Sequence, residues 1–384
     1  MARKDFRLST ELQGQAARLR APAAVRLPLF CHQPVVSSGE AVAKGQLVAE
    51  AMDPGLAGVH ASVAGTVAGI EPDAVEIVAE GDACVEPTDI SNISGPELGE
   101  TLHAMGAATT RLIPSRTLII NAMPPEPGTT FVEQLLRDHR DVLAAGLDAV
   151  RRVVRPVEVF LALIQGDTAR FGNCTVKHLP PVHPAGLDPM VHKAVTGLER
   201  PRNTVIVSAL ALYHIGLVVE TGLPLTETIL TVGGQNVLAP IGASARDLLE
   251  HAGISALDGG RVVFGGPFRG QALHSLSQGL PADAGALLFF PSGSAAPVAD
   301  APCLDCGECV RRCPARIRPG ELSRMAEFRL YERARDNHLH ACIDCGICGY
   351  WCPSRRPILQ YLRLARQELA LMELAELERA EAAS

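Results

Sequence analysis

Near its C-terminus the sequence reads Cys303-Leu-Asp-Cys306-Gly-Glu-Cys309-Val-Arg-Arg-Cys313-Pro314, and it repeats this spacing as Cys342-Ile-Asp-Cys345-Gly-Ile-Cys348-Gly-Tyr-Trp-Cys352-Pro353. These two runs hold eight of the 11 cysteines in the 384-residue chain. In each run two residues separate the first three cysteines, the fourth follows after three more, and a proline ends the run. This spacing is that of the bacterial ferredoxin pattern, which binds [4Fe–4S] clusters.

The two runs predict two clusters that exchange ligands. Each cluster needs four thiolates, and in two-cluster ferredoxins the fourth cysteine of a run binds the other cluster. We therefore assign the first cluster to Cys303, Cys306, Cys309 and Cys352. We assign the second cluster to Cys342, Cys345, Cys348 and Cys313. Gly307 and Gly346 follow the second cysteine of each run, where a side chain would crowd the cubane.

Zinc binding and disulfide formation are the competing explanations of these cysteines. Structural zinc sites use two separated pairs of ligands, whereas each run brings three closely spaced cysteines and a fourth. A disulfide framework is typical of small secreted domains, and this chain has neither property. Two clusters therefore remain the prediction, and they imply that single electrons pass through the chain. The sequence shows no acid–base or nucleophile pattern of a hydrolase, so we assign no catalytic residue.

Composition and charge limit the class of protein. The chain is 47% hydrophobic and 20% charged, so it can bury sizeable cores in several domains. Its net charge is −7 and it has no basic or acidic tract, which argues against nucleic acid as a partner. The N-terminus lacks the apolar run of a signal peptide, and the longest apolar stretch, 205–219, is too short and too polar for a spanning helix. We expect a cytoplasmic protein, either free or peripheral on the inner face of the cell membrane.

The pattern of strands and helices changes along the chain and predicts a multidomain α/β and α+β protein. Short strands with glycine turns over 24–80 resemble biotinyl and lipoyl carrier modules, a barrel-sandwich hybrid, without the carrier lysine. Strands alternate with helices over 98–225, which predicts a mostly parallel sheet and includes a helix over 130–154. A small glycine-punctuated α+β unit follows over 226–275. A looser stretch, about 276–302, then leads to the cluster domain at 300–357, with a helix over 321–338, and to a C-terminal helix at 358–384.

Several segments of the chain resemble a known family. They are Pro34-Val-Val with Gly39-Glu and Lys44-Gly45-Gln, Val59-His-Ala-Ser-Val-Ala-Gly-Thr-Val, Gly222-Leu-Pro-Leu-Thr-Glu with Thr231-Val-Gly-Gly, Val263-Phe-Gly-Gly-Pro, and the second cysteine run continuing to Gln360-Tyr-Leu-Arg363. Through them the chain, from about 27 to 366, resembles the C subunit of the Rnf ion-translocating electron-transport complex. The same arrangement is similar to the cobalamin-reducing flavoprotein of propanediol microcompartments.

The resemblance implies a flavin and NADH module related to the flavoprotein subunit of respiratory complex I, followed by a small SLBB-like unit. In that family FMN lies against a loop of the form Gly-Gly-x-Gly-Phe-Pro-Thr, and this chain keeps only Gly106 of it. A second family segment beside the flavin retains Asn121 and Glu126, but its acidic pair has become Met123 and Pro124. The resemblance thus places FMN and NAD(P)H near Gly106, Asn121 and Glu126, whereas the losses favour a scaffold that only carries the clusters.

Two functions follow from these alternatives. In the first, an oxidoreductase subunit relays single electrons through both clusters between NAD(P)H or flavin and a ferredoxin-type or membrane-complex partner. In the second, a relay or assembly subunit holds clusters but has no NADH site; a cobalamin-reductase-like flavoprotein is a further alternative. The expected partners are other members of an electron-transfer complex, membrane-embedded ones included, and ferredoxin or flavodoxin. The arginines after the two runs have three interpretations: they raise the reduction potential of a nearby cluster, steer such an acidic carrier, or form ordinary solvated surface. They are Arg311, Arg312, Arg316, Arg318, Arg355 and Arg356.

Overall fold

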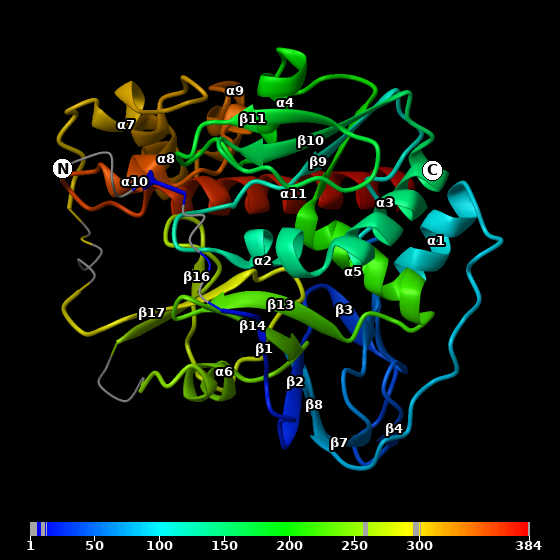
Figure 1. Ribbon diagram of the computed structural model, residues 1–384. Helices are drawn as coiled ribbons and strands as arrows, with labels where there is room; N and C mark the ends of the chain where they lie inside the picture. Colours follow the sequence, from blue (N-terminus) through cyan, green and yellow to red (C-terminus); the bar gives the residue numbers. More distant parts are fainter. Residues whose placement is uncertain are drawn as a thin grey trace. The chain divides into compact units, whose positions relative to one another are not determined.

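The computed structural model describes residues 6–8, 12, 14–255, 260–294, 299 and 301–382 (Figure 1). The chain forms two compact units, Met1–Ser292 and Gly293–Ser384. Within the described ranges, no helix is both long enough and apolar enough to cross a membrane.

The first unit contains a small β structure made of two sheets. One sheet has the order β2-β8-β7-β4, with strands Ala24–Pro28, Ala74–Ala79, Gly65–Glu71 and Ala41–Val42. The other has the order β3-β5-β6, with strands His32–Pro34, Leu47–Ala51 and Val59–His60. Side chains alternate between the faces of a strand, and this buries Val25 and Leu27 of β2. The two sheets form the barrel-sandwich arrangement that the strand pattern predicts.

A parallel sheet with helices forms the α/β part of the first unit. Its order is β11-β10-β9-β12, with strands Thr175–Leu179, Glu158–Ile164, Thr117–Asn121 and Thr204–Ser208. The helices are α1 (Pro96–Ala104), α2 (Phe131–Asp138), α3 (Arg140–Val154), α4 (Asp188–Thr196) and α5 (Ala209–Thr221). The helix expected over 130–154 is therefore two helices, separated at His139. Helices α3 and α5 cross closely, since a Cβ on Gly146 would lie 2.2 Å from the carbonyl oxygen of Leu212.

A second, mixed sheet completes the first unit. Its order is β1-β14-β13-β17-β15-β16, with strands Ala17–Arg18, Gln235–Pro240, Glu227–Val232, Ala286–Phe290, Arg261–Phe264 and Gln271–Ala272, and it is accompanied by α6 (Ala245–His251). Strand β17 corrects one expectation, because it lies within the stretch predicted to be loose. Its five residues are Ala-Leu-Leu-Phe-Phe, and they pair with both β13 and β15.

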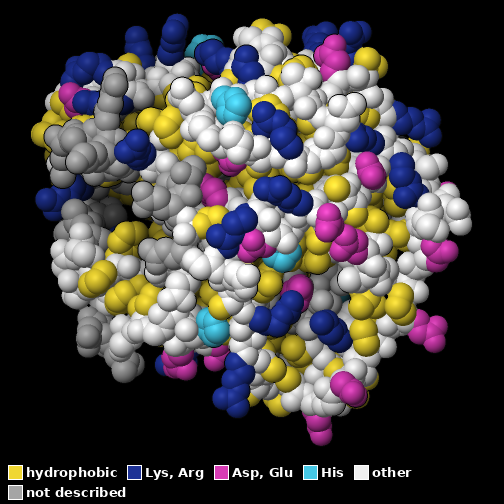
Figure 2. All heavy atoms as spheres, viewed as in Figure 1, with side chains coloured by type: hydrophobic (Ala, Val, Ile, Leu, Met, Phe, Trp, Pro, Cys, Tyr) yellow, Lys and Arg dark blue, Asp and Glu magenta, His cyan; other side chains and the backbone are white. Residues whose placement is uncertain are grey.

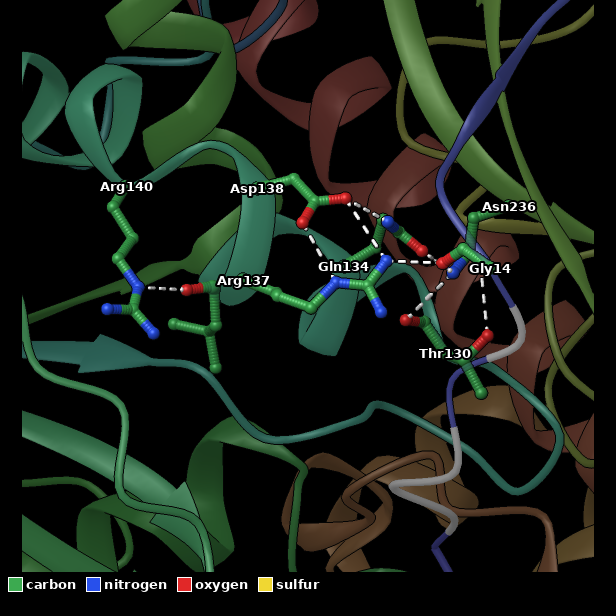
Figure 3. A network of polar contacts seen from close by, with 8 residues as sticks. Gly14, Thr130, Gln134, Arg137, Asp138, Arg140 and Asn236 are labelled. Carbon is green, nitrogen blue, oxygen red and sulfur yellow. Dashed lines mark hydrogen bonds and ion pairs between the residues drawn. The ribbon is translucent and has the colours of Figure 1, made fainter.

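Buried polar contacts connect α2 to this mixed sheet (Figure 3). The Asn236 amide donates to the Thr130 carbonyl oxygen at 3.2 Å and to Gln134 Oε1 at 2.9 Å. The Thr130 hydroxyl donates to Asn236 Oδ1 at 3.1 Å. Further along the helix, Arg137 bonds to Asp138 and to the carbonyl oxygen of Gly14. The network therefore connects α2 with β14 and with the N-terminal segment.

The second unit is helical. It contains α7 (Glu308–Arg311), α8 (Pro319–Glu327), α9 (Tyr331–Asp336), the 3-10 helix η2 (Leu339–Ala341), α10 (Ile347–Tyr350) and α11 (Ile358–Ala382). Its core packs α8 and α9 against α11 through Leu322, Ala334 and Leu362. The helix expected over 321–338 is interrupted after Glu327, and Arg329 there has a positive φ of 57°.

Candidate iron–sulfur site

The two cysteine runs have the same backbone conformation. Asp305 and Asp344 have φ values of 55° and 58°, and Gly307 and Gly346 have φ values of 72° and 74°. Each glycine precedes a four-residue helix, α7 or α10. The left-handed backbone explains glycine at these positions, because a side chain is strained there. The sequence repeat is thus a structural repeat of one loop that wraps its cysteines around a centre.

Four cysteines from both runs line one cavity. They are Cys303, Cys306 and Cys309 of the first run and Cys352 of the second. A separate cavity is lined by Cys342, Cys345 and Cys348 of the second run together with Cys313 of the first. The structure therefore brings together the two crossed sets of cysteines that the spacing predicts. Within the described ranges, no three His, Cys, Asp or Glu side chains converge closely enough to hold one metal ion. A cubane instead receives one thiolate at each of its four irons.

Gly320 shows that the first cavity fits a cluster. A Cβ built on Gly320 would lie 3.1 Å from Cys309 Sγ and 4.0 Å from Cys303 Sγ. Gly320 is the second residue of α8, so the backbone at the start of this helix faces the thiols. Burial raises the pKa of the Cys309 thiol, and a hydrogen bond from the Gly320 backbone N–H opposes this shift. The four thiolates and the missing side chain match the needs of a [4Fe–4S] cluster.

The two sets of cysteines differ in burial. Cys306 of the first set is exposed, whereas Cys345 and Cys348 of the second set are buried. Burial raises the pKa of Cys345 to about 12, and it also raises the pKa of Cys348. Free thiolates are therefore unfavourable in the second cavity, and metal ligation is what would make them form. The first cavity lies at the surface of its unit and the second lies deeper.

Charged residues surround both cavities. Beside the second, the Asp344 carboxylate binds Arg363 at 2.6 Å and Arg366 at 3.6 Å, and the Asp344 backbone N–H lies 3.4 Å from Cys342 Sγ. Near the first, Arg311 donates to the carbonyl oxygen of Cys306 at 3.0 Å. Lys and Arg side chains gather at the edge of the view in Figure 2 where Figure 1 places α7 and α8.

Arg355 and Arg356 are neighbours in the sequence but have different environments. Arg355 is exposed, as the steering of a partner and an ordinary solvated surface both require. Arg356 is only 6% exposed and lines the cavity of Cys303 and Cys352, so it is neither solvated surface nor available for steering a partner. Gly320 is a residue of this site that the sequence did not single out. Arg356 was among the arginines expected near a cluster, but its burial was not expected.

The three residues expected near a flavin make contacts within the protein. A Cβ on Gly106, at a φ of 90°, would lie 3.2 Å from His60 Nδ1. The Asn121 amide donates to the Gly186 carbonyl oxygen at 2.9 Å and to Asp188 Oδ1 at 2.8 Å.

Glu126 is buried at 3% exposure, and its carboxylate accepts hydrogen bonds from the backbone N–H groups of Phe268 at 2.7 Å and Arg269 at 3.2 Å. The polar groups that Asn121 and Glu126 would offer a flavin are therefore occupied by protein atoms, and His60 lies against Gly106. As they stand, these three residues do not fit an FMN site.

Two protein families match parts of the chain. Residues 10–90 match the RnfC barrel sandwich hybrid domain, and residues 297–353 match the 4Fe-4S dicluster domain. These matches confirm the predicted barrel-sandwich hybrid and the predicted [4Fe–4S] dicluster domain.

Curated relatives extend the similarity over most of the chain. The C subunit of the ion-translocating oxidoreductase complex of Rhodobacter capsulatus is 26% identical, over 79% of this chain and 69% of the relative. The C subunit of the proton-translocating ferredoxin:NAD(+) oxidoreductase complex of Clostridium ljungdahlii is 27% identical, over 87% of this chain and 84% of the relative. Together with the barrel match, they confirm the predicted resemblance to the C subunits of Rnf complexes.

Solved structures are weakly similar to the chain, and one of them illustrates the extent. It is an NAD+-reducing [NiFe]-hydrogenase in the H2-reduced state, with a TM-score of 0.42 and 17% identity, over 68% of this chain and 52% of that chain.

Proposed function

We propose that this chain is an electron-transfer subunit of an Rnf-type complex, in which two [4Fe–4S] clusters relay single electrons. One observation carries the proposal: two cavities are each lined by four cysteines, three from one run and one from the other. When bound, the clusters supply one-electron redox chemistry. In this proposal Cys303, Cys306, Cys309 and Cys352 hold the first cluster, and Cys342, Cys345, Cys348 and Cys313 hold the second.

The first cavity is the exchange point with a partner protein in this proposal. Cys306 is exposed there, and the neighbouring Leu304 and Val310 are 66% and 41% exposed. Apolar side chains beside an accessible cofactor suit the small, transient interfaces of electron-transfer proteins. The more deeply buried second cavity would then exchange electrons through the first or with another subunit.

Positive charge around the first cavity favours an acidic partner such as a ferredoxin or a flavodoxin. Arg318 and Arg324 line the cavity, Arg311 donates to the Cys306 carbonyl oxygen, and Arg312 shares Glu308 with Arg311. Three carboxylates, Asp305, Glu308 and Glu321, form exposed ion pairs with these four arginines, so these side chains carry one more positive than negative charge. Complementary charge mainly increases the rate of encounter between partners. The same protein would sit on the inner face of the cell membrane through the other subunits of its complex.

A flavin and NADH site is the second candidate, and the resemblance alone favours it. The contacts of Gly106, Asn121 and Glu126 support the alternative, a relay subunit without its own nicotinamide site. The two candidates make opposite predictions for the isolated, cluster-loaded chain. If the chain has a flavin and NADH site, NADH bleaches the cluster absorbance and heat releases a fluorescent flavin. If it is a relay subunit without a nicotinamide site, dithionite bleaches the clusters and NADH does not.

The experiment that tests the relay function is anaerobic purification followed by iron analysis and EPR. About eight irons per chain and two interacting cluster signals after reduction are expected, since each cubane holds four irons. Stopped-flow mixing with a reduced bacterial ferredoxin then tests whether the chain accepts electrons. Full iron loading with no electron uptake from ferredoxin or NADH would leave the chain without the proposed role.

A further inference from the structure

Arg356 is a buried cation beside the first set of cysteines. Its side chain is 5% exposed. Its guanidinium donates to Glu327 Oε2 at 2.5 Å through Nη2 and to the Ala301 carbonyl oxygen at 3.2 Å through Nη1. These two contacts fix the orientation of the guanidinium plane. Burial of a charged side chain requires partners for its donors, and two of the nitrogens have them.

The third nitrogen is the exception. In the described part of the chain, Nε of Arg356 is buried and has no hydrogen-bond partner. Arg356 lines the same cavity as the four cysteines of the first set. The Cys303 thiol is also close enough to interact electrostatically with the guanidinium. A buried donor without a partner, at the wall of a cavity made for a metal–sulfur cluster, indicates a bond to that cluster.

The internal repeat supplies a comparison within the same molecule. Arg356 follows the fourth cysteine of its run by four residues, and Ile317 follows Cys313 by the same number. Both are buried, and each lines the cavity to which its run lends the fourth cysteine. The same position of the repeat therefore carries an arginine with an unpartnered Nε at the first cavity and an aliphatic side chain at the second.

We propose that Arg356 donates a hydrogen bond from Nε to a sulfur of the first cluster and thereby raises the reduction potential of that cluster above that of the second. The inference rests on the proposed function, because it requires both clusters. Hydrogen bonds to cluster sulfurs stabilise the more negative reduced state. Glu327 balances the positive charge of the guanidinium. The hydrogen bond from Nε is therefore the main cause of the higher reduction potential in this proposal. An electron that enters the chain then rests on the first, more accessible cluster.

EPR-monitored redox titration of the loaded chain tests this proposal. The variant Cys345→Ala is expected to keep only the first cluster, and its spectrum identifies the EPR signal of that cluster. At a fixed potential, Arg356→Ile is expected to lower the reduced-to-oxidised ratio of the first cluster at least tenfold, a shift of about 59 mV for one electron. Arg356→Lys keeps the charge but lacks Nε, and it should shift the ratio in the same direction. Arg355→Gln, the exposed neighbour, is the control and should leave both clusters unchanged.

Variants of Arg356 also lose its hydrogen bonds to Glu327 and to the Ala301 carbonyl oxygen. A second measurement therefore leaves Arg356 unchanged. Pulsed EPR of reduced, 15N-arginine-labelled protein should show nitrogen and exchangeable-proton couplings to the first cluster. These couplings should persist in Arg311→Gln and in the double variant Arg318→Gln with Arg324→Gln, which removes the two other guanidinium groups that line the cavity. Two clusters with no such coupling, or an unshifted potential in a fully loaded Arg356→Ile, would overturn the role of Arg356 alone. Failure of the unmodified chain to hold two clusters would instead overturn the proposed function.

Discussion

The guanidinium carbon of Arg312 lies 3.5 Å from the centre of the Trp351 ring. Arg312 precedes Cys313 and Trp351 precedes Cys352, so the contact joins the two runs next to the cysteines that each run lends to the other. Crossed ligation requires the runs to stay side by side, and this contact is one of the interactions that hold them there. It also places a cation on an aromatic face, the favourable geometry for such a pair.

Arg312→Gln should therefore loosen both clusters. A cation–π contact at a partly exposed site contributes about 0.5–1 kcal/mol. Iron release to a chelator under anaerobic conditions should then be roughly two- to fivefold faster than in the unmodified chain. Arg335→Gln is the matched control, because Arg335 forms only a 3.6 Å contact with exposed Asp336 among the ion pairs described. Equal release rates for the two variants would contradict the role of the Arg312–Trp351 contact.

Gly320→Ala should damage the first cluster selectively. The added methyl group would lie 3.1 Å from Cys309 Sγ, so the thiol or the helix must shift. The same change raises intrinsic helix propensity by about 1 kcal/mol, so the cluster-free chain should be no less stable. We expect iron content to fall toward one cluster, as measured by iron analysis and EPR. Gly349→Ala in α10 is the control, since its Cβ would meet nothing within 4 Å. Full loading and an unchanged spectrum for Gly320→Ala would show that the cavity is wider than described.

The spacing of the first three cysteines predicts a loop in each run because it is a local property of the chain, whereas the exchange of the fourth cysteine joins two runs that are distant in sequence and was predicted from the two-cluster ferredoxin pattern. Each loop repeats the same positive-φ positions, so seven residues are enough to shape it. The burial of Arg356, in contrast to the expected exposure of Arg355, could not be predicted in this way. Both lie between Pro353 and α11, where no helical or strand period indicates which side chain faces the interior. The partners of the buried Arg356 guanidinium, Glu327 and the Ala301 carbonyl oxygen, are both distant in sequence.

Other misses have similar causes. The break between α8 and α9 has no glycine or proline to signal it, and Arg329 adopts the left-handed conformation instead. Strand β17 is short and lies among Gly, Pro, Ser and Ala residues, and its partners β13 and β15 are distant in sequence.

Gly106, Asn121 and Glu126 were assigned by resemblance alone. Their contacts with His60, Gly186 and Phe268 depend on tertiary structure that local sequence does not reveal.

Glu133 should make the stability of the first unit depend on pH. In the described part of the chain both of its carboxylate oxygens are buried without a hydrogen-bond partner. Burial, with a smaller contribution from Asp167, raises the pKa of Glu133 from 4.5 to about 8. Between these values the folded state keeps a proton that the unfolded state has lost. The free energy of unfolding therefore falls as the pH rises through this window.

Glu133→Gln should remove that dependence. The variant should match the unmodified chain near pH 4.5 and exceed its free energy of unfolding by a few kcal/mol at about pH 9, since each pKa unit corresponds to about 1.4 kcal/mol. Urea unfolding of the cluster-free chain at about pH 6 and pH 9 measures the difference. Glu158→Gln, at an exposed carboxylate paired with Arg116 at 3.5 Å, is the control. A constant difference between variant and unmodified chain at both pH values would exclude titration of Glu133.

The arginines around the first cavity should control the salt dependence of electron exchange. Arg318 and Arg324 line the cavity, and replacing both with Gln removes two positive charges. With a reduced acidic ferredoxin as the probe, the second-order rate constant at low salt should fall several-fold. The two rates should converge at about 0.5 M salt, where exposed charges are screened. The double variant Arg333→Gln with Arg335→Gln on α9 is the control, because it removes the same charge elsewhere. An equal fall of the rate constant in this control would mean that only the net charge of the chain affects the rate.

Paired cysteine variants separate crossed from uncrossed ligation. In the crossed arrangement Cys303 and Cys352 serve one cluster, so Cys303→Ala with Cys352→Ala should leave about four irons per chain, as each single variant does. In the uncrossed arrangement these residues serve different clusters, and the same double variant would lose both. The double variant Cys348→Ala with Cys352→Ala gives the opposite expectation. In the crossed arrangement these residues serve different clusters, so both clusters are lost, whereas in the uncrossed arrangement they serve the same cluster and only that one is lost. Iron analysis and EPR of the two double variants give opposite results in the two arrangements. Retention of one cluster by the Cys348 and Cys352 double variant would refute the assignment of Cys352 to the first cluster.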